Sequence, residues 1–364
     1  MTGIAALVAR IIAGERVEPT GREWDPVTIA SVAEHHGVGA ILWEATAGAA
    51  MPSVHGALDA TVRAAIAREV FVQREVRAVT AALADGGVRA LLLKGTALAY
   101  TAYPQPWLRP RTDTDLLVGA EDAPAASHAL SGLGYERTDA ITSGTLVSHQ
   151  WAFERHDAHG VRHVLDLHWK IVNPHMLADA LTFDDLWAGS SVVHSLGNAA
   201  HAPAPGRSLA LACIHRAAHH HGHERLVWLY DIHLLASPFG EADWEAFGEL
   251  AVSRGVAAIC LDGLQAAGDA LGTVVPAPLA ARLGAAAARE PARRFVTGAL
   301  NRRGVLLSDL AVLPAWSDRV RLLREHAFPP AAFIRRRYGV TRPIWLPALY
   351  VRRLLTGAYK WVRP

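Results

Sequence analysis

Two segments that lie close together in the sequence constrain the fold of this chain more than any other feature. The first, residues 89–93, has the composition of a short buried strand and is followed by Lys94, Gly95 and Thr96. Glycine lets the backbone approach a ligand closely, and the apolar periodicity of residues 97–103 predicts a helix that Thr96 opens. Free backbone N–H groups at the start of such a helix would face an anion. The segment therefore predicts an anion-binding turn.

The second segment places two carboxylates at the start of a strand. Asp113 and Asp115 are two residues apart, so in an extended strand their side chains leave the same face, and residues 116–118 continue as an apolar run. Alone, an Asp-x-Asp pair is more often a solvated turn or a helix cap. Here two unpaired carboxylates at the end of a buried strand would repel one another unless a cation lay between them. Neighbouring carboxylate oxygens are the ligands of a hard cation such as Mg²⁺, so the pattern predicts a metal site.

A third carboxylate lies downstream in a predicted hairpin. Residues 150–155 and 161–169 have strand character and are joined by the turn-rich residues 156–160, which places Asp166 in the middle of a strand. Asp166 and His168 share one face of that strand. An aspartate among apolar strand residues is costly unless it is paired or coordinated. We therefore expect Asp166 to complete the carboxylate set.

Together these motifs resemble the nucleotidyltransferase superfamily of the DNA polymerase beta type, whose signature is a Gly-Ser or Gly-Thr turn, an Asp-x-Asp strand and a later Asp. More narrowly, the chain resembles a bacterial family of uncharacterised nucleotidyltransferases. The matching elements are Lys94-Gly95, Arg109-Pro110, the strand from Asp113 to Val118, the strand from Asp166 to Trp169, and a helical histidine-rich segment from His215 to Asp231. Thr114 departs from the large aliphatic residue common at its position, and we expect this to change packing and not chemistry.

The resemblance implies an α+β fold, with a small mixed-sheet nucleotidyltransferase core flanked by N-terminal helices and a mostly helical C-terminal domain. It also implies an enzyme that moves a nucleoside monophosphate from a nucleoside triphosphate to a hydroxyl group of an unknown acceptor. The cofactor would be Mg²⁺, with Mn²⁺ as the alternative ion. Asp113, Asp115 and Asp166 would ligate the metal and carry catalysis by in-line displacement at the α-phosphate.

Basic residues near the acidic motifs are candidates for nucleotide binding. The chain has 36 lysine and arginine residues, of which three are lysine, and Lys94 and Lys170 each stand beside an acidic motif. A compact ammonium suits a phosphate oxygen, so pyrophosphate is expected to leave against Lys94, Gly95 and Thr96. Lys170 is equally compatible with a solvated surface. Arg109 either binds the triphosphate or pairs with a carboxylate across the sheet, and we favour phosphate binding.

A histidine-rich segment follows in the second half of the chain. His215, His219 and His223 recur at four-residue spacing and are followed by Asp231 and His233, a pattern that can bind zinc. Packing is the stronger interpretation, because no glutamate occupies the His-Glu-x-x-His position and the segment ends in an apolar face. We expect a cleft that faces the predicted nucleotidyltransferase core, and the candidates for lining it are His168, Lys170, His215 and His219.

Two other functions are compatible with parts of the sequence. One is a metal-dependent hydrolase built on residues 215–233, which would require neither Gly95 nor Asp113. The other is a non-catalytic nucleotide-binding module, which would keep the turn and lack an intact carboxylate set. The presence of all three carboxylate candidates argues against the module, and nucleotidyl transfer is the function that we favour.

Composition and hydrophobic patterning divide the chain into four parts. We expect an N-terminal helical lead-in at residues 1–88, the nucleotidyltransferase core at 89–173, a helical domain at 174–325 and a basic, aromatic segment at 326–364. The last segment has eight lysine and arginine residues and no acidic residue. Its candidate partners are nucleic acid, an anionic membrane surface and the acidic body of its own protein, and we prefer the last because it needs no partner.

Composition also bounds the environment of the protein. Hydrophobic residues make up 51% of the chain and charged residues 19%, which is typical of a globular protein. No uninterrupted apolar stretch reaches the length of a transmembrane span. Cys213 and Cys260 lie in apolar helical settings, so we expect two reduced core cysteines in a cytoplasmic protein.

Overall fold

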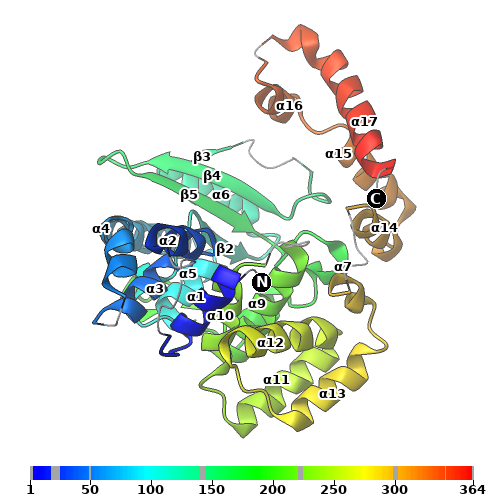
Figure 1. Cartoon of the computed structure of the whole chain (residues 1–364). Coiled ribbons are helices and arrows are strands. Elements are labelled where there is room, and N and C mark those ends of the chain that lie inside the picture. Colours follow the sequence, from blue (N-terminus) through cyan, green and yellow to red (C-terminus); the bar gives the residue numbers. More distant parts are fainter. Residues whose placement is uncertain are drawn as a thin grey trace.

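The computed structural model describes residues 3–17, 25–48, 51–138, 144–219, 224–297, 302–340 and 342–362. Within them the chain forms a mixed β-sheet with helices on both faces, followed by a helical extension (Figure 1). This arrangement confirms the predicted α+β fold class, in which a small mixed sheet lies between N-terminal helices and a mostly helical C-terminal part.

The described residues form one seven-stranded sheet. Its strands are β1 (Ala90–Leu92), β2 (Thr114–Val118), β3 (Glu136–Arg137), β4 (Gln150–His156), β5 (Arg162–His168), β6 (Ser191–Val192) and β7 (His201–Ala202). The strand order is β3-β4-β5-β2-β1-β7-β6, so β1 and β2 lie inside the sheet. β2 is antiparallel to β1 and parallel to β5. β1 and residues 116–118 of β2 are apolar because both faces of these inner strands are buried, as Leu91, Leu92, Leu116 and Leu117 show with no exposed surface.

Two helices cover one face of the sheet. They are α4 (Pro52–Asp85) and α6 (Ala123–Gly132). Val79 of α4 and Leu130 of α6 belong to the same hydrophobic cluster as Leu92 and Leu116 of the inner strands. After α4 the chain turns at Gly87, whose φ of 72° favours glycine, and enters β1 directly.

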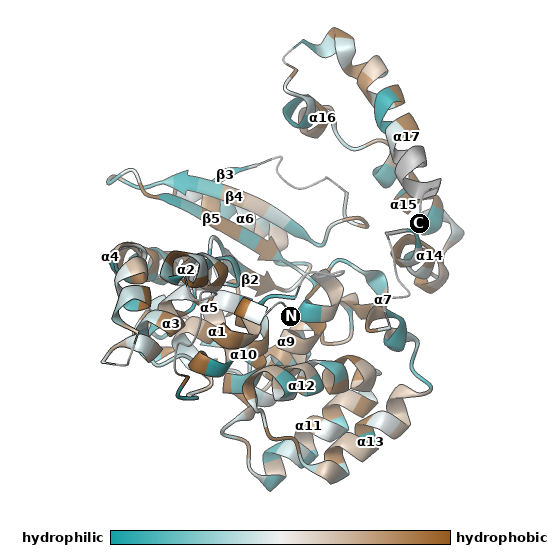
Figure 2. Ribbon diagram, in the orientation of Figure 1, coloured by the Kyte–Doolittle hydropathy of each residue, from teal (hydrophilic) through white to brown (hydrophobic). Residues whose placement is uncertain are grey.

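Helices from both ends of the chain cover the opposite face. The N-terminal ones are α1 (Gly3–Ile12), α2 (Pro26–His35) and α3 (Gly39–Thr46), and the later ones are α7 (His175–Ala178), α8 (Phe183–Trp187), α9 (Pro205–His219), α10 (Leu226–Ala236), α11 (Glu241–Ser253), α12 (Ala257–Leu271) and α13 (Ala277–Ala287). Buried residues of both groups form a single hydrophobic cluster with Leu91 and Leu117 of the sheet. Figure 2 shows brown, hydrophobic ribbon along much of α9 and α10.

The boundaries of the four predicted segments stay predictions. The helices of residues 1–88 share a hydrophobic core with those of residues 174–325. The sheet also extends beyond residue 173, because β6 and β7 lie at residues 191–202. Short helical elements complete this part of the chain: α5 (Lys94–Thr101) and the 3₁₀ helices η1 (Pro106–Leu108), η2 (His194–Leu196) and η3 (Pro291–Phe295).

The helical extension closes the chain. It comprises α14 (Arg302–Val312), α15 (Trp316–Ala327), α16 (Ala331–Tyr338), η4 (Pro343–Trp345) and α17 (Leu346–Val362). In Figure 1 α16 and α17 extend away from the sheet and from the other helices. Cys213 and Cys260 are buried and do not form a disulfide, as expected for reduced core cysteines. No helix in the described ranges is both long and apolar enough to cross a membrane.

Candidate active site

The turn between β1 and α5 brings a lysine back over the sheet. Strand β1 ends at Leu92 and α5 begins at Lys94, two residues before the predicted helix start at Thr96. Among the residues that the structure describes, Lys94 is the one non-glycine residue with a positive φ, at 48°. That conformation is strained for a residue with a Cβ. From this position the Nζ of Lys94 donates a hydrogen bond of 2.6 Å to Oδ1 of Asp115 in β2.

Strand register places the second and third predicted carboxylates side by side. In the parallel pairing of β2 with β5, Asp115 is aligned with Asp166. Aligned residues of neighbouring strands point to the same face of a sheet. Asp113 lies one residue before β2, and its backbone carbonyl accepts a hydrogen bond of 3.4 Å from Oγ1 of the buried Thr96. All three carboxylates line one cleft.

The three carboxylates differ in protonation because their surroundings differ. Burial acts to raise the pKa of Asp115, but the Lys94 ammonium and the His168 hydrogen bond outweigh it and hold the pKa well below its usual range. Burial, followed by the negative charge of Asp115, raises the pKa of Asp113 to about 6. The same two causes raise the pKa of Asp166 to about 7. One lysine therefore does not neutralise the cluster, and an additional cation would relieve the repulsion.

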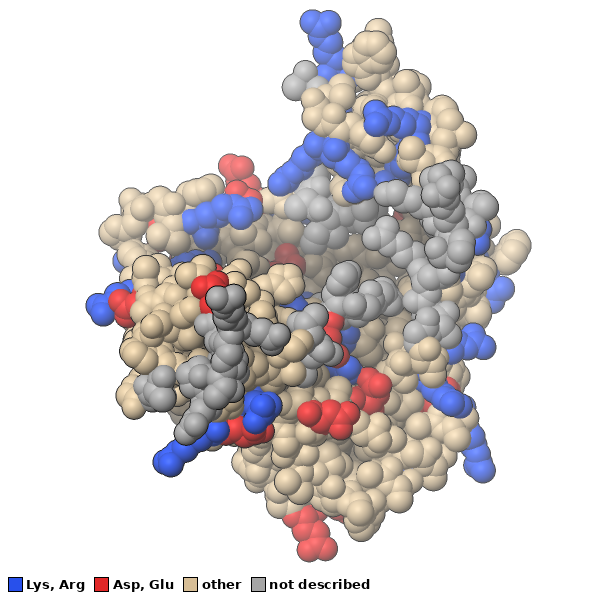
Figure 3. Space-filling view, in the orientation of Figure 1, with Lys and Arg blue, Asp and Glu red and all other residues tan. Residues whose placement is uncertain are grey.

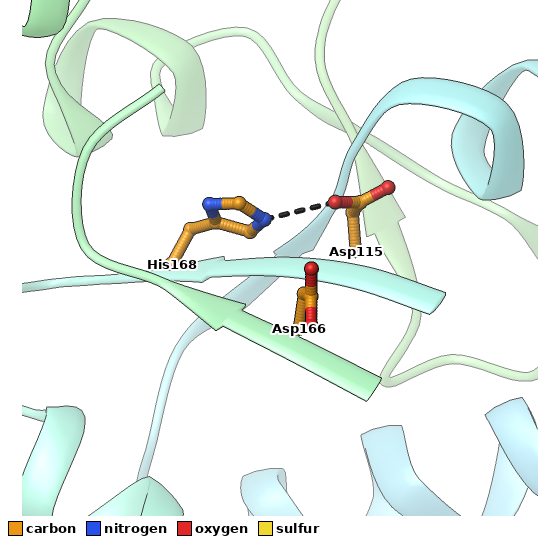
Figure 4. A group of neighbouring side chains, drawn as sticks. All are labelled: Asp115, Asp166 and His168. Atoms are coloured by element: carbon orange, nitrogen blue, oxygen red, sulfur yellow. Dashed lines mark hydrogen bonds and ion pairs between the residues drawn. The ribbon is translucent and has the colours of Figure 1, made fainter. Parts of the chain in front are cut away.

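Metal-ligand atoms gather at this point of the sheet. Oxygen and nitrogen atoms of Asp115, Asp166 and His168 all lie within 4.8 Å of one another (Figure 4). Nε2 of His168 is 2.8 Å from Oδ1 of Asp115. Since burial, and then the charge of Lys94, lower the pKa of His168 to about 4, the imidazole is neutral, and its Nε2–H donates to the carboxylate. Carboxylate oxygens of this kind can hold a divalent cation, and the identity of the ion stays a prediction.

A glutamine that the sequence motifs did not single out supports the third carboxylate. Nε2 of Gln150 in β4 donates a hydrogen bond of 2.6 Å to Oδ2 of Asp166 in β5. Gln150 is the antiparallel partner of His168, so the predicted hairpin contained the signal for this contact. Asp166 lies in β5, the strand of the hairpin that pairs with β2, and Gln150 reaches it from the neighbouring strand β4. Gln150 thereby orients one carboxylate oxygen and leaves the other for a ligand.

Arg109 pairs with a carboxylate, as one of the two sequence interpretations allowed, but its partner lies on a helix and not across the sheet. Its Nε and Nη2 each donate a hydrogen bond of 2.8 Å to the carboxylate of Asp231 in α10. Tyr103 adds a 2.7 Å hydrogen bond from its hydroxyl to the same carboxylate. The guanidinium lies against Gly95, where an added Cβ would be 3.3 Å from Nη1. A role of Arg109 in phosphate binding stays a prediction.

The remaining predicted site residues have different positions in the structure. His215 lines the cleft, whereas Nζ of Lys170 forms a 2.7 Å ion pair with Asp179 on the surface. The side chain of His219 and residues 220–223 lie outside the described part of the chain. His233 contacts Thr273, with Nδ1 2.9 Å from Oγ1. Within the described ranges, the residues of the histidine-rich segment form no group of metal ligands.

The cleft has a volume of about 560 Å³, and its walls come from distant parts of the chain. The carboxylates and the turn at Lys94 form one wall, and Glu34, Gly37, Arg225 and Trp228 line another. Figure 3 shows the molecule hollowed between the body and the helical extension. Because Glu34 of α2 and Gly37 line this cleft, the N-terminal helices contribute to the site and do not only lead into the sheet.

Arg225 is a cleft residue that sequence reasoning missed. Its Nε donates a hydrogen bond of 3.0 Å to the backbone carbonyl of His35, and its guanidinium lies 5.7 Å from the centre of the Trp228 ring. Burial and the charge of Arg109 lower its pKa. Arg225 forms no ion pair with any described carboxylate. Its position inside the segment from His215 to Asp231, one of the elements that carry the family resemblance, was the available signal.

The fold and the site together define a class of protein. A mixed sheet presents aligned aspartates beside a Gly-Thr turn at the start of a helix, as nucleotidyltransferases do. The chain belongs to the family described as uncharacterised nucleotidyltransferases, whose model matches residues 21–287, about three quarters of its length. That range contains every residue of the site and ends before the helical extension. A comparison with curated proteins finds no significant match.

Proposed function

We propose that this protein transfers a nucleoside monophosphate from a nucleoside triphosphate to a hydroxyl group of an acceptor, with a divalent cation as cofactor. The observation that carries the proposal is the register of β2 with β5, which aligns Asp115 with Asp166 in a cleft beside Lys94. This arrangement agrees with nucleotidyltransferases of the DNA polymerase beta type, and family membership supports the reaction class.

Asp115 and Asp166 would hold the cation, with Asp113 as a further ligand from the start of β2. When bound, Mg²⁺ or Mn²⁺ neutralises phosphate charge and draws the acceptor hydroxyl towards the α-phosphate. Gln150 fixes Oδ2 of Asp166 and leaves Oδ1, so Oδ1 would both contact the cation and accept the proton of the acceptor hydroxyl that lies beside it. His168 holds Asp115 in place through its 2.8 Å hydrogen bond.

Two features of the cleft would hold the triphosphate. The N-terminus of α5 has no side-chain cap, so backbone N–H groups of its first turn are available to phosphate oxygens. Arg225 lies in the cleft without a carboxylate partner, whereas Lys94, Arg109 and Arg111 are each engaged with one. Lys94 is released to the phosphates once another cation occupies its place beside Asp115. Arg225 therefore joins Lys94 as a candidate phosphate ligand.

The test is equilibrium binding of each nucleoside triphosphate with and without Mg²⁺. Wild-type protein is expected to bind at least one triphosphate with clear dependence on Mg²⁺. A double variant, Asp115→Asn with Asp166→Asn, should lose at least about tenfold in that affinity, since both direct ligands are gone. The exposed Asp179→Asn is the matched control and should bind as wild type does.

Three outcomes would contradict the proposal. They are triphosphate binding that is insensitive to Mg²⁺, undiminished binding by the double variant, and the absence of binding to any triphosphate. Removal of zinc with a selective chelator should leave binding unchanged, because the described part of the histidine-rich segment assembles no metal site. A loss that only zinc restores would favour the hydrolase.

A further inference from the structure

The end of the helical extension has an exposed apolar stripe. On α17, Val351, Leu354 and Leu355 are spaced so that they share one helix face, and they are 55%, 42% and 67% exposed. Ile344 and Trp345 of η4 are 80% and 58% exposed. Figure 2 shows brown and teal turns alternating along α17. We call residues 331–356, which comprise α16, η4 and the first turns of α17, the C-terminal hairpin.

This stripe is not the face by which the hairpin holds together. The small interior between α16 and α17 is formed by Ile334, which has no exposed surface, and Leu349, which is 9% exposed. Tyr350 closes it through a hydrogen bond of 2.5 Å from its hydroxyl to the carbonyl of Pro329. The apolar stripe therefore lies outside the packed interior and faces solvent in the single chain.

The C-terminal hairpin that carries the stripe is also rich in basic side chains. Residues 326–364 contain eight lysine and arginine residues and no acidic residue. Arg336, Arg337, Arg342 and Arg352 are exposed, and none of them forms an ion pair with a described carboxylate. In Figure 3 blue atoms gather on this part of the molecule.

The protein's own acidic surface does not take up these charges. Arg336 lies near enough to Glu154 of β4 to help lower the pKa of that carboxyl group, but the ion pair of Glu154 is with Arg162, at 2.6 Å. The preferred sequence interpretation, in which the basic segment contacts the acidic body of its own protein, therefore stays a prediction: in the described residues Arg336 approaches Glu154, but no ion pair joins the segment to a carboxylate. An external partner that is both anionic and apolar would satisfy both features of the hairpin.

We propose that the C-terminal hairpin binds the surface of an anionic lipid bilayer, with the stripe of α17 and Trp345 inserted at the headgroup level and the arginines against the lipid charges. An amphipathic helix with aliphatic and aromatic residues on one side and arginines beside them is the form that lies in a membrane interface. Nucleic acid would neutralise the arginines but leave the aliphatic stripe exposed to water. The hairpin lies outside the range of the family match, so this surface is separate from the transferase core.

The experiment is sedimentation of the full-length protein with vesicles of phosphatidylcholine alone and with vesicles in which one third of the lipid is phosphatidylserine. Wild-type protein should sediment with the anionic vesicles and should not bind the neutral ones. Arg336→Glu with Arg337→Glu should weaken binding at least about twentyfold, since each surface arginine contributes about fivefold. Val351→Ser with Leu355→Ser should weaken it about tenfold through lost apolar burial.

Matched substitutions elsewhere separate this effect from general changes in charge or hydropathy. Arg293→Glu with Arg294→Glu reverses two adjacent exposed arginines of η3, and Leu307→Ser removes a leucine of α14 that is 66% exposed. Both controls should bind as wild type does. Insertion also predicts a blue shift in the fluorescence that Trp345 contributes, measured as the difference between wild type and Trp345→Phe.

Several results would overturn the proposal. Absence of binding to the anionic vesicles does so directly. Binding that survives the serine variant shows that the apolar stripe does not insert. A competing single-stranded RNA that displaces the vesicles, and whose binding depends on the arginines but not on Val351 and Leu355, identifies a nucleic-acid surface instead. None of these outcomes depends on nucleotide binding in the cleft.

Discussion

The ion pair between Arg109 and Asp231 gives the sharpest prediction about stability. Both groups are buried, at 9% and 4% exposure, and two N–H···O hydrogen bonds of 2.8 Å join them. Asp231→Asn keeps the shape of the side chain and removes its charge, which leaves a buried guanidinium without compensation. Such a loss costs about 3–5 kcal/mol. This cost is a large part of the free energy of unfolding of a typical protein, which is about 5–15 kcal/mol.

Replacing the whole pair should be far less costly than breaking it. Arg109→Met with Asp231→Leu removes both charges, and substitutions of this kind are often neutral. The Tyr103 hydroxyl would then lose its 2.7 Å acceptor, at a cost of about 1–3 kcal/mol, so the expected recovery requires Tyr103→Phe as well. The assay is urea unfolding followed by circular dichroism. A cost below about 1 kcal/mol for Asp231→Asn, or a triple variant no more stable than that single variant, would refute the reasoning.

The same triple variant decides what Arg109 does for function. Because it should fold, its affinity for a triphosphate in the presence of Mg²⁺ can be compared directly with that of wild type. Unchanged affinity shows that the pair only joins α10 to the sheet. A clear loss shows that Arg109 also contacts phosphate, as its motif predicts.

Three further predictions concern the turn and a buried histidine. Gly95→Ala places a methyl group 3.3 Å from Nη1 of Arg109, which hydrogen bonds hold in place, and should cost about 1–3 kcal/mol in urea unfolding. Lys94→Gly should be about 1 kcal/mol more stable than Lys94→Ala in thermal unfolding, because only glycine relieves the φ of 48°. Burial lowers the pKa of His149 to about 3 in the folded protein, whereas the ordinary value is 6.5. Between pH 3 and pH 6.5 the unfolded state therefore binds more protons than the folded state does. Stability should therefore fall as pH decreases through this window, by up to about 5 kcal/mol, and His149→Leu should flatten the profile in acid unfolding.

Local patterns in the sequence were sufficient to find the carboxylates. Alternation within the predicted hairpin placed Asp166 and His168 on one face, and the structure brings both to Asp115. The alignment of Asp115 with Asp166 is a different kind of information, because β2 and β5 are parallel and separated by more than 40 residues. Their register depends on how the whole sheet packs, which no local period records.

Partners of the buried charges could not be predicted in the same way. Arg109 and Asp231 are separated by 122 residues, and their contact depends on the tertiary packing that brings α10 and α5 into one hydrophobic cluster. Lys94 was predicted to meet phosphate, and in the structure it contacts Asp115. Arg225 lies in a segment that the resemblance singled out, but its place in the cleft without a described carboxylate partner is visible only in the structure. Burial and pairing are tertiary properties, whereas residue type and spacing are local ones.

The charge of the cleft also implies that nucleotide and metal bind together. Asp113, Asp115 and Asp166 share Lys94 as their ion-pair partner, so a phosphate group that approaches these carboxylates without a metal ion meets locally negative charge. A cation alone meets a lysine that already occupies Asp115. Each ligand should therefore raise the affinity of the other, and by thermodynamic linkage the two factors must be equal. Calorimetric titration of the triphosphate with and without Mn²⁺, and of Mn²⁺ with and without the triphosphate, measures both factors after correction for the complex that the two form in solution. Independent binding would show that the carboxylates do not hold the ion that accompanies the nucleotide.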